Sequence, residues 1–202
     1  MRTSIAVVGH GPSLLRHEYG NDIDSHDLVV RMKWHQKLLE EPKMFGSRTD
    51  IACSSVGVGR KLRRLWPSVN MFCVAYDSRT YEMADADAKQ IKDEFDGAQL
   101  FMDKALCRYW DDRYRSLLGD QEGEPHTSSG FHVLMYLGKY FSPATVTLYG
   151  FDSMMSGEWT WSLTRGPDWQ HYPKHRFDIE HAMLKDLEAA YRIQFHNQGD
   201  DR

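Results

Sequence analysis

Short apolar runs rich in β-branched residues, bounded by turn residues, recur along the 202-residue chain and predict β-strands. Between several of these runs, apolar residues recur at helical spacing, as Met183, Leu184 and Leu187 do, and predict helices. The predicted strands are Ile5–Gly9, Leu28–Met32, Asp50–Ser54, Val69–Tyr76, Gln99–Met102, Thr145–Phe151 and Arg192–Phe195, and the predicted helices are Arg60–Trp66, Tyr81–Phe95, Asp103–Leu118, Gly130–Phe141 and Phe177–Tyr191. This alternation favours an α/β sandwich with a mainly parallel central sheet.

Length and composition are typical of one globular domain. A chain of 202 residues can bury a sizeable core, so we expect residues 1–202 to form a single domain. Hydrophobic residues make up 41% of the chain and charged residues 27%, which excludes wholesale disorder. The formal net charge of −4 leaves no basic excess for holding a nucleic-acid backbone, so a duplex-binding protein is disfavoured.

Neither a membrane span nor a disulfide framework is predicted. The first apolar run, Ile5–Val8, is far shorter than the roughly 20 residues that a membrane span needs. It also lacks the cleavage region of a signal peptide. The cysteines Cys53, Cys73 and Cys107 are odd in number and lack the CxxC spacing of a zinc cluster. We therefore expect a cytoplasmic location.

The first motif is a hydrophobic strand that ends in the turn Gly9-His10-Gly11-Pro12-Ser13. Glycines allow backbone N–H groups to approach a ligand closely at the carboxyl edge of an α/β sheet, where ligands of these folds usually bind. The turn is neither a GxGxxG fingerprint nor a P-loop, because no GK[ST] follows. Gly9 and Gly11 therefore either contact a ligand or simply make a strand-to-helix turn.

The second motif, Thr127-Ser128-Ser129-Gly130, directly precedes a predicted helix. A serine at this position can cap the helix by accepting a hydrogen bond from one of its first N–H groups, and local sequence favours this interpretation. The functional alternative is that free N–H groups, two hydroxyls and the positive end of the helix dipole form a seat for a phosphate or carboxylate.

The third motif places His171 and His175 four residues apart, just before or at the start of the last predicted helix. Two histidines at this spacing could ligate zinc, but no third ligand is arranged nearby in a recognised zinc pattern. A histidine can also take a proton from an attacking hydroxyl, and a second can stabilise a departing phosphate. Asp178 and Glu180 suit capping and the dipole of the first helical turn.

Taken together, these segments resemble the sialyl motifs of the eukaryotic-type sialyltransferase family. The motifs occur in the family's order and span nearly the entire chain. The long motif is similar to Ile5–Ser55, above all at Ala6–Gly9, Tyr19-Gly20, Ile23–Asp27, Val30–Met32 and Gly46–Thr49. The short motif is similar to Thr127–Phe131 and Val146–Phe151, and the third motif is similar to His171-Tyr172. The very short motif is a histidine followed five residues later by a glutamate, and it is similar to His175 and Glu180.

The resemblance implies a single-domain, GT-A-like, metal-independent glycosyltransferase that uses a CMP-linked sugar acid and inverts the anomeric centre. His175 would be the general base for a glycan hydroxyl, His171 would bind the leaving CMP phosphate, and Glu180 would support them. The implied donor-binding residues are Gly9, His10, Gly11, Ser13, Arg31, Lys33, Ser128, Ser129, Gly130, Gly150, Phe151 and Tyr172. The CMP-sugar is then a co-substrate, and no cofactor or metal is implied.

The chain departs from the family pattern at several positions. Family members usually carry asparagine where His10 and Lys33 stand, and both positions are expected nucleotide contacts. Thr127 stands where the short motif usually opens with proline. The cysteine pair that joins the long and short motifs in the family is missing, which fits a protein that is not exposed to an oxidising compartment.

The expected partners are a nucleotide-sugar donor and a glycan acceptor, with no nucleic acid. The acceptor, the linkage and the oligomeric state stay open. The long segment Ser153–Lys174 has no periodicity and is typical of a lid or binding loop. Its tryptophans, Trp159, Trp161 and Trp169, either stack on sugar faces or pack the loop down.

Three alternative functions stay open beside sialic acid transfer. The donor could be CMP-Kdo, because a CMP pocket and a carboxylate seat would look alike in sequence. The chain could instead hydrolyse a sugar nucleotide by passing the sugar to water. It could also be a non-catalytic nucleotide-binding module in which His10 and Lys33 mark a changed pocket.

Overall fold

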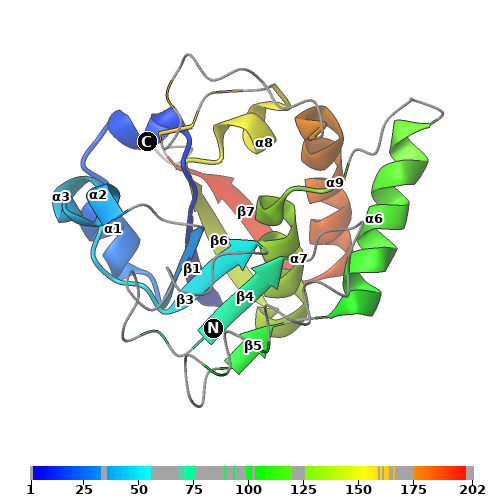
Figure 1. Cartoon of the computed structure of the whole chain (residues 1–202), viewed down its shortest axis with the longest axis horizontal. Helices are drawn as coiled ribbons and strands as arrows, with labels where there is room; N and C mark the ends of the chain where they lie inside the picture. The colour runs from blue at the N-terminus through cyan, green and yellow to red at the C-terminus, as the bar shows by residue number, and fades with distance from the viewer. Residues whose placement is uncertain are drawn as a thin grey trace.

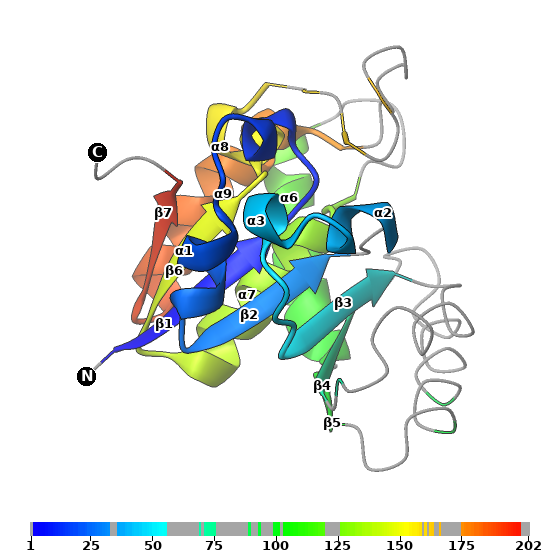
Figure 2. The same ribbon diagram turned by 90° about the vertical axis from the view of Figure 1, so that its left-hand side faces the viewer.

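The computed structural model contains a seven-stranded sheet with the strand order β5-β4-β3-β2-β1-β6-β7, in which every neighbouring pair is parallel. Helices α1, α2 and α3 cover one face of the sheet and α6, α7 and α9 cover the other (Figure 1). Figure 2 looks onto the sheet, with β7 at one edge and β5 at the other. The structure describes residues 2–32, 36–55, 69, 71–75, 89, 93, 99–101, 103–119, 126–158, 160, 162–163, 166 and 175–198. The predicted α/β class is confirmed.

The strands lie within a couple of residues of their predicted positions. They are β1 (Thr3–Val8), β2 (Leu28–Met32), β3 (Ile51–Ser55), β4 (Met71–Ala75), β5 (Gln99–Phe101), β6 (Ala144–Tyr149) and β7 (Ile193–Asn197). A parallel sheet that is covered on both faces needs apolar side chains at nearly every position, and the resulting continuous runs are visible in the sequence.

Three long helices also match their predictions, whereas the short ones were not predicted. The helices whose bounds lie among the described residues are the 3-10 helix η1 (Pro12–Leu15), α1 (Gly20–Ser25), α2 (Gln36–Leu39), α3 (Pro42–Phe45), α6 (Lys104–Leu118), α7 (Ser129–Phe141), α8 (Asp152–Ser156) and α9 (Phe177–Ala190). One or two turns are too short to show helical periodicity. The predicted helix Arg60–Trp66 lies outside the described residues, and within Tyr81–Phe95 only Lys89 and Asp93 are described, both helical.

Alternate residues of β1 belong to two separate hydrophobic clusters, as the period of two in a strand requires. Ile5 and Val7 pack in the cluster that includes α6, α7 and α9, whereas Ala6 and Val8 pack with η1, α1 and α3. All four side chains are fully buried. The strand that ends in the first motif is therefore held from both faces.

The connections of α7 and α9 place both candidate motifs at one edge of the sheet. α7 leads into β6 through Ser142-Pro143, and α9 leads into β7 through Tyr191-Arg192. The C-terminal ends of these helices thus lie at the amino edge of the parallel sheet. Their N-terminal ends lie at the carboxyl edge, where ligands of α/β folds bind.

The described residues also bear on two further expectations. None of the helices among them is both long and apolar enough to cross a membrane. Cys53 and Cys107 are buried free thiols. Burial raises the pKa of Cys107 to about 12, although a hydrogen bond with Tyr136 partly opposes this shift, so the thiol stays protonated at neutral pH.

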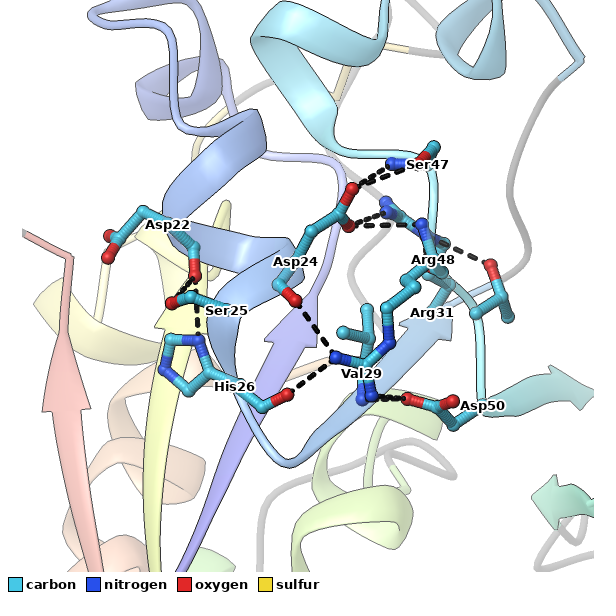
Figure 3. A network of polar contacts seen from close by, with 10 residues as sticks. Asp22, Asp24, Ser25, His26, Val29, Arg31, Ser47, Arg48 and Asp50 are labelled. Carbon is cyan, nitrogen blue, oxygen red and sulfur yellow. Dashed lines mark hydrogen bonds and ion pairs between the residues drawn. The ribbon is translucent and has the colours of Figure 1, made fainter.

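On the face covered by α1, Arg48 joins the end of this helix to the start of β3 (Figure 3). Its Nη1 donates to the carbonyl oxygens of Asp24 (2.8 Å) and His26 (2.7 Å). Its Nη2 donates to the carbonyl oxygen of Asp27 (2.9 Å) and to Oδ2 of Asp50 (2.7 Å). One guanidinium therefore satisfies carbonyl groups that a helix end would otherwise leave without partners.

Arg31 is fully buried in the same network. Its Nε donates to the carbonyl oxygen of Arg48 (2.7 Å) and to Oγ1 of Thr49 (3.1 Å), and its Nη2 lies 3.8 Å from Oδ1 of Asp24. Burial lowers the pKa of Arg31 to about 10, while the charges of Asp24 and Asp50 oppose the shift, so Arg31 stays charged at neutral pH. These contacts hold β2 to the start of β3, and the donor-binding role of Arg31 stays a prediction.

We expect Arg48→Ala to lower the free energy of unfolding by about 2 kcal/mol, because hydrogen bonds to charged groups contribute about 1.5–3 kcal/mol. Arg48→Lys should recover only part of this loss, because an ammonium cannot reproduce the forked geometry. Urea denaturation measures the free energy of unfolding of both variants. Arg115→Ala, an exposed position on α6, is the control, and an equally small change in Arg48→Ala would contradict the joining role of Arg48.

Candidate active site

The turn after β1 closes tightly against the end of β6. The N–H of Gly9 donates to the carbonyl oxygen of Tyr149 (2.7 Å), and the N–H of Gly11 donates to that of Gly150 (2.8 Å). A Cβ on Gly11 would lie 1.7 Å from Oδ2 of Asp152, and a Cβ on Gly9 would lie 2.6 Å from the carbonyl oxygen of Gly150. The glycines therefore permit a close backbone approach, and these two N–H groups are bonded to the protein itself.

Two polar residues that the sequence analysis missed fix this turn. Ser13 Oγ donates to Oδ2 of Asp152 (2.9 Å), and Nε2 of Gln198 donates to the same Ser13 hydroxyl oxygen. The N–H of Gly150 donates to Oε1 of Gln198 (3.0 Å). Asp152 could have been found as the first charged residue after a strand end. Gln198 follows β7 and carries no comparable signal.

The predicted binding loop reaches the same turn. The N–H of Leu163 donates to the carbonyl oxygen of His10 (2.8 Å). Nearer the start of the loop, α8 occupies Asp152–Ser156, and the hydroxyls of Ser153 and Thr160 are hydrogen-bonded at 2.9 Å. The loop therefore begins with a helix that the sequence analysis did not predict.

The ring of Phe151 lies between the first motif and the start of α7. A Cβ on Gly9 would lie 3.0 Å from Cε2 of Phe151, and a Cβ on Gly130 would lie 3.1 Å from its Cε1. Gly130 would also meet the methyl group of Met154 on α8 at 3.3 Å. Donor-binding candidates from three distant segments of the sequence are thus brought together at the carboxyl edge of the sheet.

Ser128 caps α7 and at the same time links α7 to α9. Its Oγ accepts a hydrogen bond from the N–H of Phe131 (3.2 Å), as the capping interpretation predicts. The Ser128 hydroxyl donates to Oε2 of Glu180 (2.7 Å), and the Ser128 N–H donates to Oε1 (2.6 Å). The acidic group that the structure shows at the start of α7 is therefore the carboxyl group of Glu180 from α9.

Glu180 is completely buried and is bonded to α7 rather than to the start of its own helix. Burial raises its pKa to about 7; the hydrogen bonds from Ser128 lower it, and the nearby charge of Asp111 raises it further. By contrast, Asp178 is exposed and pairs with Arg176 (2.6 Å). Glu180 thus titrates near neutrality between the two helices.

His175 stands just before α9 with one ring nitrogen fixed. Its Nδ1 lies 3.1 Å from the carbonyl oxygen of His126, and a carbonyl can only accept, so Nδ1 carries the proton. In the neutral ring Nε2 is then the basic nitrogen. The rings of His126 and His175 meet edge to face with centroids 5.0 Å apart. The next residue, Arg176, donates its N–H to the Tyr114 hydroxyl (2.9 Å), which anchors the start of α9.

Some predicted residues make other contacts or lie outside the described residues. Lys33, His171 and Tyr172 are not described, nor are Trp159, Trp161 and Trp169. Arg31 contacts the network of Figure 3. Among the described residues, no three His, Cys, Asp or Glu side chains form a group that could hold a metal ion. The candidates that the structure places at the carboxyl edge are Gly9, His10, Gly11, Ser13, Ser128, Ser129, Gly130, Gly150, Phe151, His175 and Glu180.

Comparison with known proteins identifies what the chain is similar to. The family model for glycosyltransferase family 29 (sialyltransferase) matches residues 3–192. No curated protein matches in sequence. A mammalian sialyltransferase has a similar structure with a TM-score of 0.59 and 20% identity, covering 96% of this chain and 69% of that one.

Two further solved structures are similar. A mammalian sialyltransferase in complex with Gal-beta-1-3GalNAc-ortho-nitrophenol has a TM-score of 0.58 and 22% identity, over 96% of this chain and 69% of that one. The sialyltransferase CstII from Campylobacter jejuni, in complex with the substrate analogue cytidine-5'-monophosphate, has a TM-score of 0.58 and 14% identity, over 98% and 80%. The expected GT-A-like sialyltransferase fold is therefore confirmed.

The raised pKa of Glu180 predicts a pH-dependent stability. The folded protein holds this proton more tightly than the unfolded chain, so the stability it contributes is fully present below the ordinary value of 4.5 and is lost as the pH rises through about 7. Relative to Glu180→Gln, which keeps partners for both Ser128 groups, we expect the protein to lose about 3 kcal/mol of unfolding free energy across this window.

Urea denaturation at about pH 5 and about pH 8 measures the difference between the two proteins, in which the titrations common to both cancel. Glu180→Ala is the control for the link itself. It leaves the buried Ser128 N–H without its acceptor and should be destabilised at both pH values. A difference between the protein and Glu180→Gln that does not change with pH would contradict the raised pKa.

Proposed function

The chain belongs to glycosyltransferase family 29, the sialyltransferases, and we propose that it moves a sialic acid, or a related 2-keto sugar acid, from a CMP-linked donor to a glycan hydroxyl. In this proposal residues 1–202 form one catalytic domain that works by inversion and needs no metal ion or cofactor. The main support is the geometry of His175, whose proton is fixed on Nδ1 beside the start of α7.

His175 is the general base of the proposed reaction. As the acceptor oxygen attacks the anomeric carbon, its proton passes to Nε2 of His175. The bond between that carbon and the phosphate oxygen of CMP breaks, and the phosphate takes the electron pair. Attack opposite the leaving group inverts the anomeric centre in one step. The hydrogen bond from Nδ1 to the carbonyl oxygen of His126 stabilises the imidazolium that forms.

The donor is proposed to lie at the start of α7 and against the turn after β1. The N–H groups of Ser129 and Gly130 belong to the first turn of α7, where the helix dipole favours phosphate oxygens. Ser128 supports the donor site indirectly, because it caps α7 and its N–H and hydroxyl are bonded to Glu180 of α9. The complex of the related CstII with cytidine monophosphate supports a CMP-linked donor.

On the acceptor side, a related mammalian enzyme has been solved with a Gal-beta-1-3GalNAc derivative, which supports a glycan hydroxyl as acceptor. Leu163, in the loop that contacts His10, belongs to the segment proposed to cover the bound sugars. The leaving-group role of His171, the donor contacts of Lys33 and Tyr172, and the cytoplasmic location stay predictions.

Replacing the proposed base tests the proposal. His175→Ala should lower kcat for transfer from CMP-sialic acid to a galactose-terminated glycan by about 10²–10⁴-fold, because general-base catalysis contributes about that much. The calorimetric Kd for CMP should change by no more than about twofold. The matched control is His181→Ala in α9, six residues further along the chain. His181 also hydrogen-bonds a carbonyl through Nδ1, that of Met154 (3.0 Å), and its variant should keep its activity.

The same assay separates the alternatives. Faster turnover of CMP-Kdo than of CMP-sialic acid would identify CMP-Kdo as the donor, and release of free sugar in the absence of glycan would identify a hydrolase. Binding of CMP with no turnover by the unaltered chain would identify a binding module. A product with retained anomeric configuration, a loss of activity on adding a chelator, or full activity of His175→Ala would contradict the mechanism.

A further inference from the structure

A buried hydrogen-bonded trio lies next in sequence to His126 and is used by none of the steps above. Thr127 Oγ1 lies 2.5 Å from Oδ1 of Asp111 and 2.8 Å from Nε2 of His132. A carboxylate can only accept, so the Thr127 hydroxyl donates to Asp111 and accepts from the Nε2–H of His132. The exposed fraction is 2% for Thr127, 2% for Asp111 and 1% for His132. We call these residues the buried trio.

Both neighbours of Thr127 in the chain are bonded to α9 or to the segment just before it. The carbonyl oxygen of His126 accepts from Nδ1 of His175 (3.1 Å), and Ser128 donates twice to Glu180 (2.6 and 2.7 Å). The position of Thr127 therefore sets the position of the carbonyl group that determines which nitrogen of His175 carries the proton. A shift of this carbonyl would free the proton to move to Nε2, and Nε2 could then no longer accept one.

Packing alone does not require these polar groups. A valine would fill nearly the same volume as Thr127 without a hydroxyl to satisfy. Burying a carboxylate and an imidazole is costly unless each finds hydrogen bonds. The Nδ1 atom of His132 has no hydrogen-bond partner in the described structure, so the imidazole is held in the trio through Nε2. The hydrogen bonds of the trio therefore fix the orientation of the Thr127 side chain, which packing alone would not do.

We infer that Thr127, Asp111 and His132 are positioning residues for the general base, which hold the His126 carbonyl so that His175 keeps its proton on Nδ1. This inference rests on the proposed function, because it takes His175 as the base. Asp111 comes from α6 and His132 from α7, so the trio ties the segment before α7 to two helices.

The first test is kinetic. Thr127→Val removes the hydroxyl at nearly constant volume and should lower kcat about tenfold or more, because the rate falls steeply when a catalytic group is misplaced. The KM for the donor and the Kd for CMP should change by no more than about twofold. Thr127→Ser restores the hydroxyl and should recover most of kcat. The matched control is Thr147→Val, which removes another threonine–histidine hydrogen bond, that between Thr147 Oγ1 and Nε2 of His26 (3.2 Å).

The second test reads the His175 ring directly and needs no turnover. Nitrogen-15 NMR of the histidine side chains distinguishes the Nδ1–H tautomer from the Nε2–H tautomer, and His175→Asn assigns the signal. The unaltered protein, Thr127→Ser and Thr147→Val should show the Nδ1–H tautomer at His175. Thr127→Val should show a mixture of the two tautomers. If Thr127→Val does not fold, Asp111→Asn undergoes both tests in its place.

The outcomes separate this inference from the proposed function. If transfer depends on His175 while Thr127→Val keeps both its kcat and its tautomer, the positioning role is overturned and the proposed function stands. If kcat falls only with the folded fraction and the tautomer is unchanged, the trio is purely structural and the inference is again overturned. If the unaltered chain transfers no sugar but Thr127→Val shifts the tautomer, the positioning stands and the proposed function fails.

Discussion

The two hydrogen bonds from Ser128 to the buried carboxyl group of Glu180 are the contact on which the candidate site depends. Glu180 and the candidate base His175 lie at the same end of α9, whereas Ser128 begins α7. Together with the hydrogen bond from His175 to the His126 carbonyl oxygen, this link fixes the base relative to the helix start that is proposed to receive the donor phosphate. Burial of the Glu180 carboxyl group is unfavourable. The two hydrogen bonds from Ser128 offset that cost, and they join α7 to α9.

Charged groups make different contacts in the network beside α1 and in the candidate site. On the α1 side, Arg48 and Arg31 pair with carbonyl oxygens and aspartates and hold the beginnings of β2 and β3 together. At the carboxyl edge, acids such as Glu180 and Asp152 accept hydrogen bonds from serines instead. The Arg48 and Arg31 network brings full positive charges to backbone carbonyls, whereas the candidate site brings the carboxyl group of Glu180 to the N-cap of α7.

The sequence predicts the sheet well because a parallel strand buried on both faces must be apolar throughout, as Ile5–Val8 is. It also predicts the cap at Ser128, which is a local interaction. It could not predict that Glu180 crosses to Ser128, or that Asp152 closes over Gly11, because these contacts join residues far apart in the chain. Single-turn helices such as α8 carry too few residues to show a period.

The position of Thr127 has a consequence for how this chain responds to heat and solvent. In the family pattern a proline usually opens the short motif, and its ring fixes the backbone covalently. Here Asp111 and His132 fix the same position through hydrogen bonds that can open and close. Such contacts can loosen locally before the whole fold melts. Catalytic competence and global stability would then be separable properties, with the first declining at milder temperatures than the second.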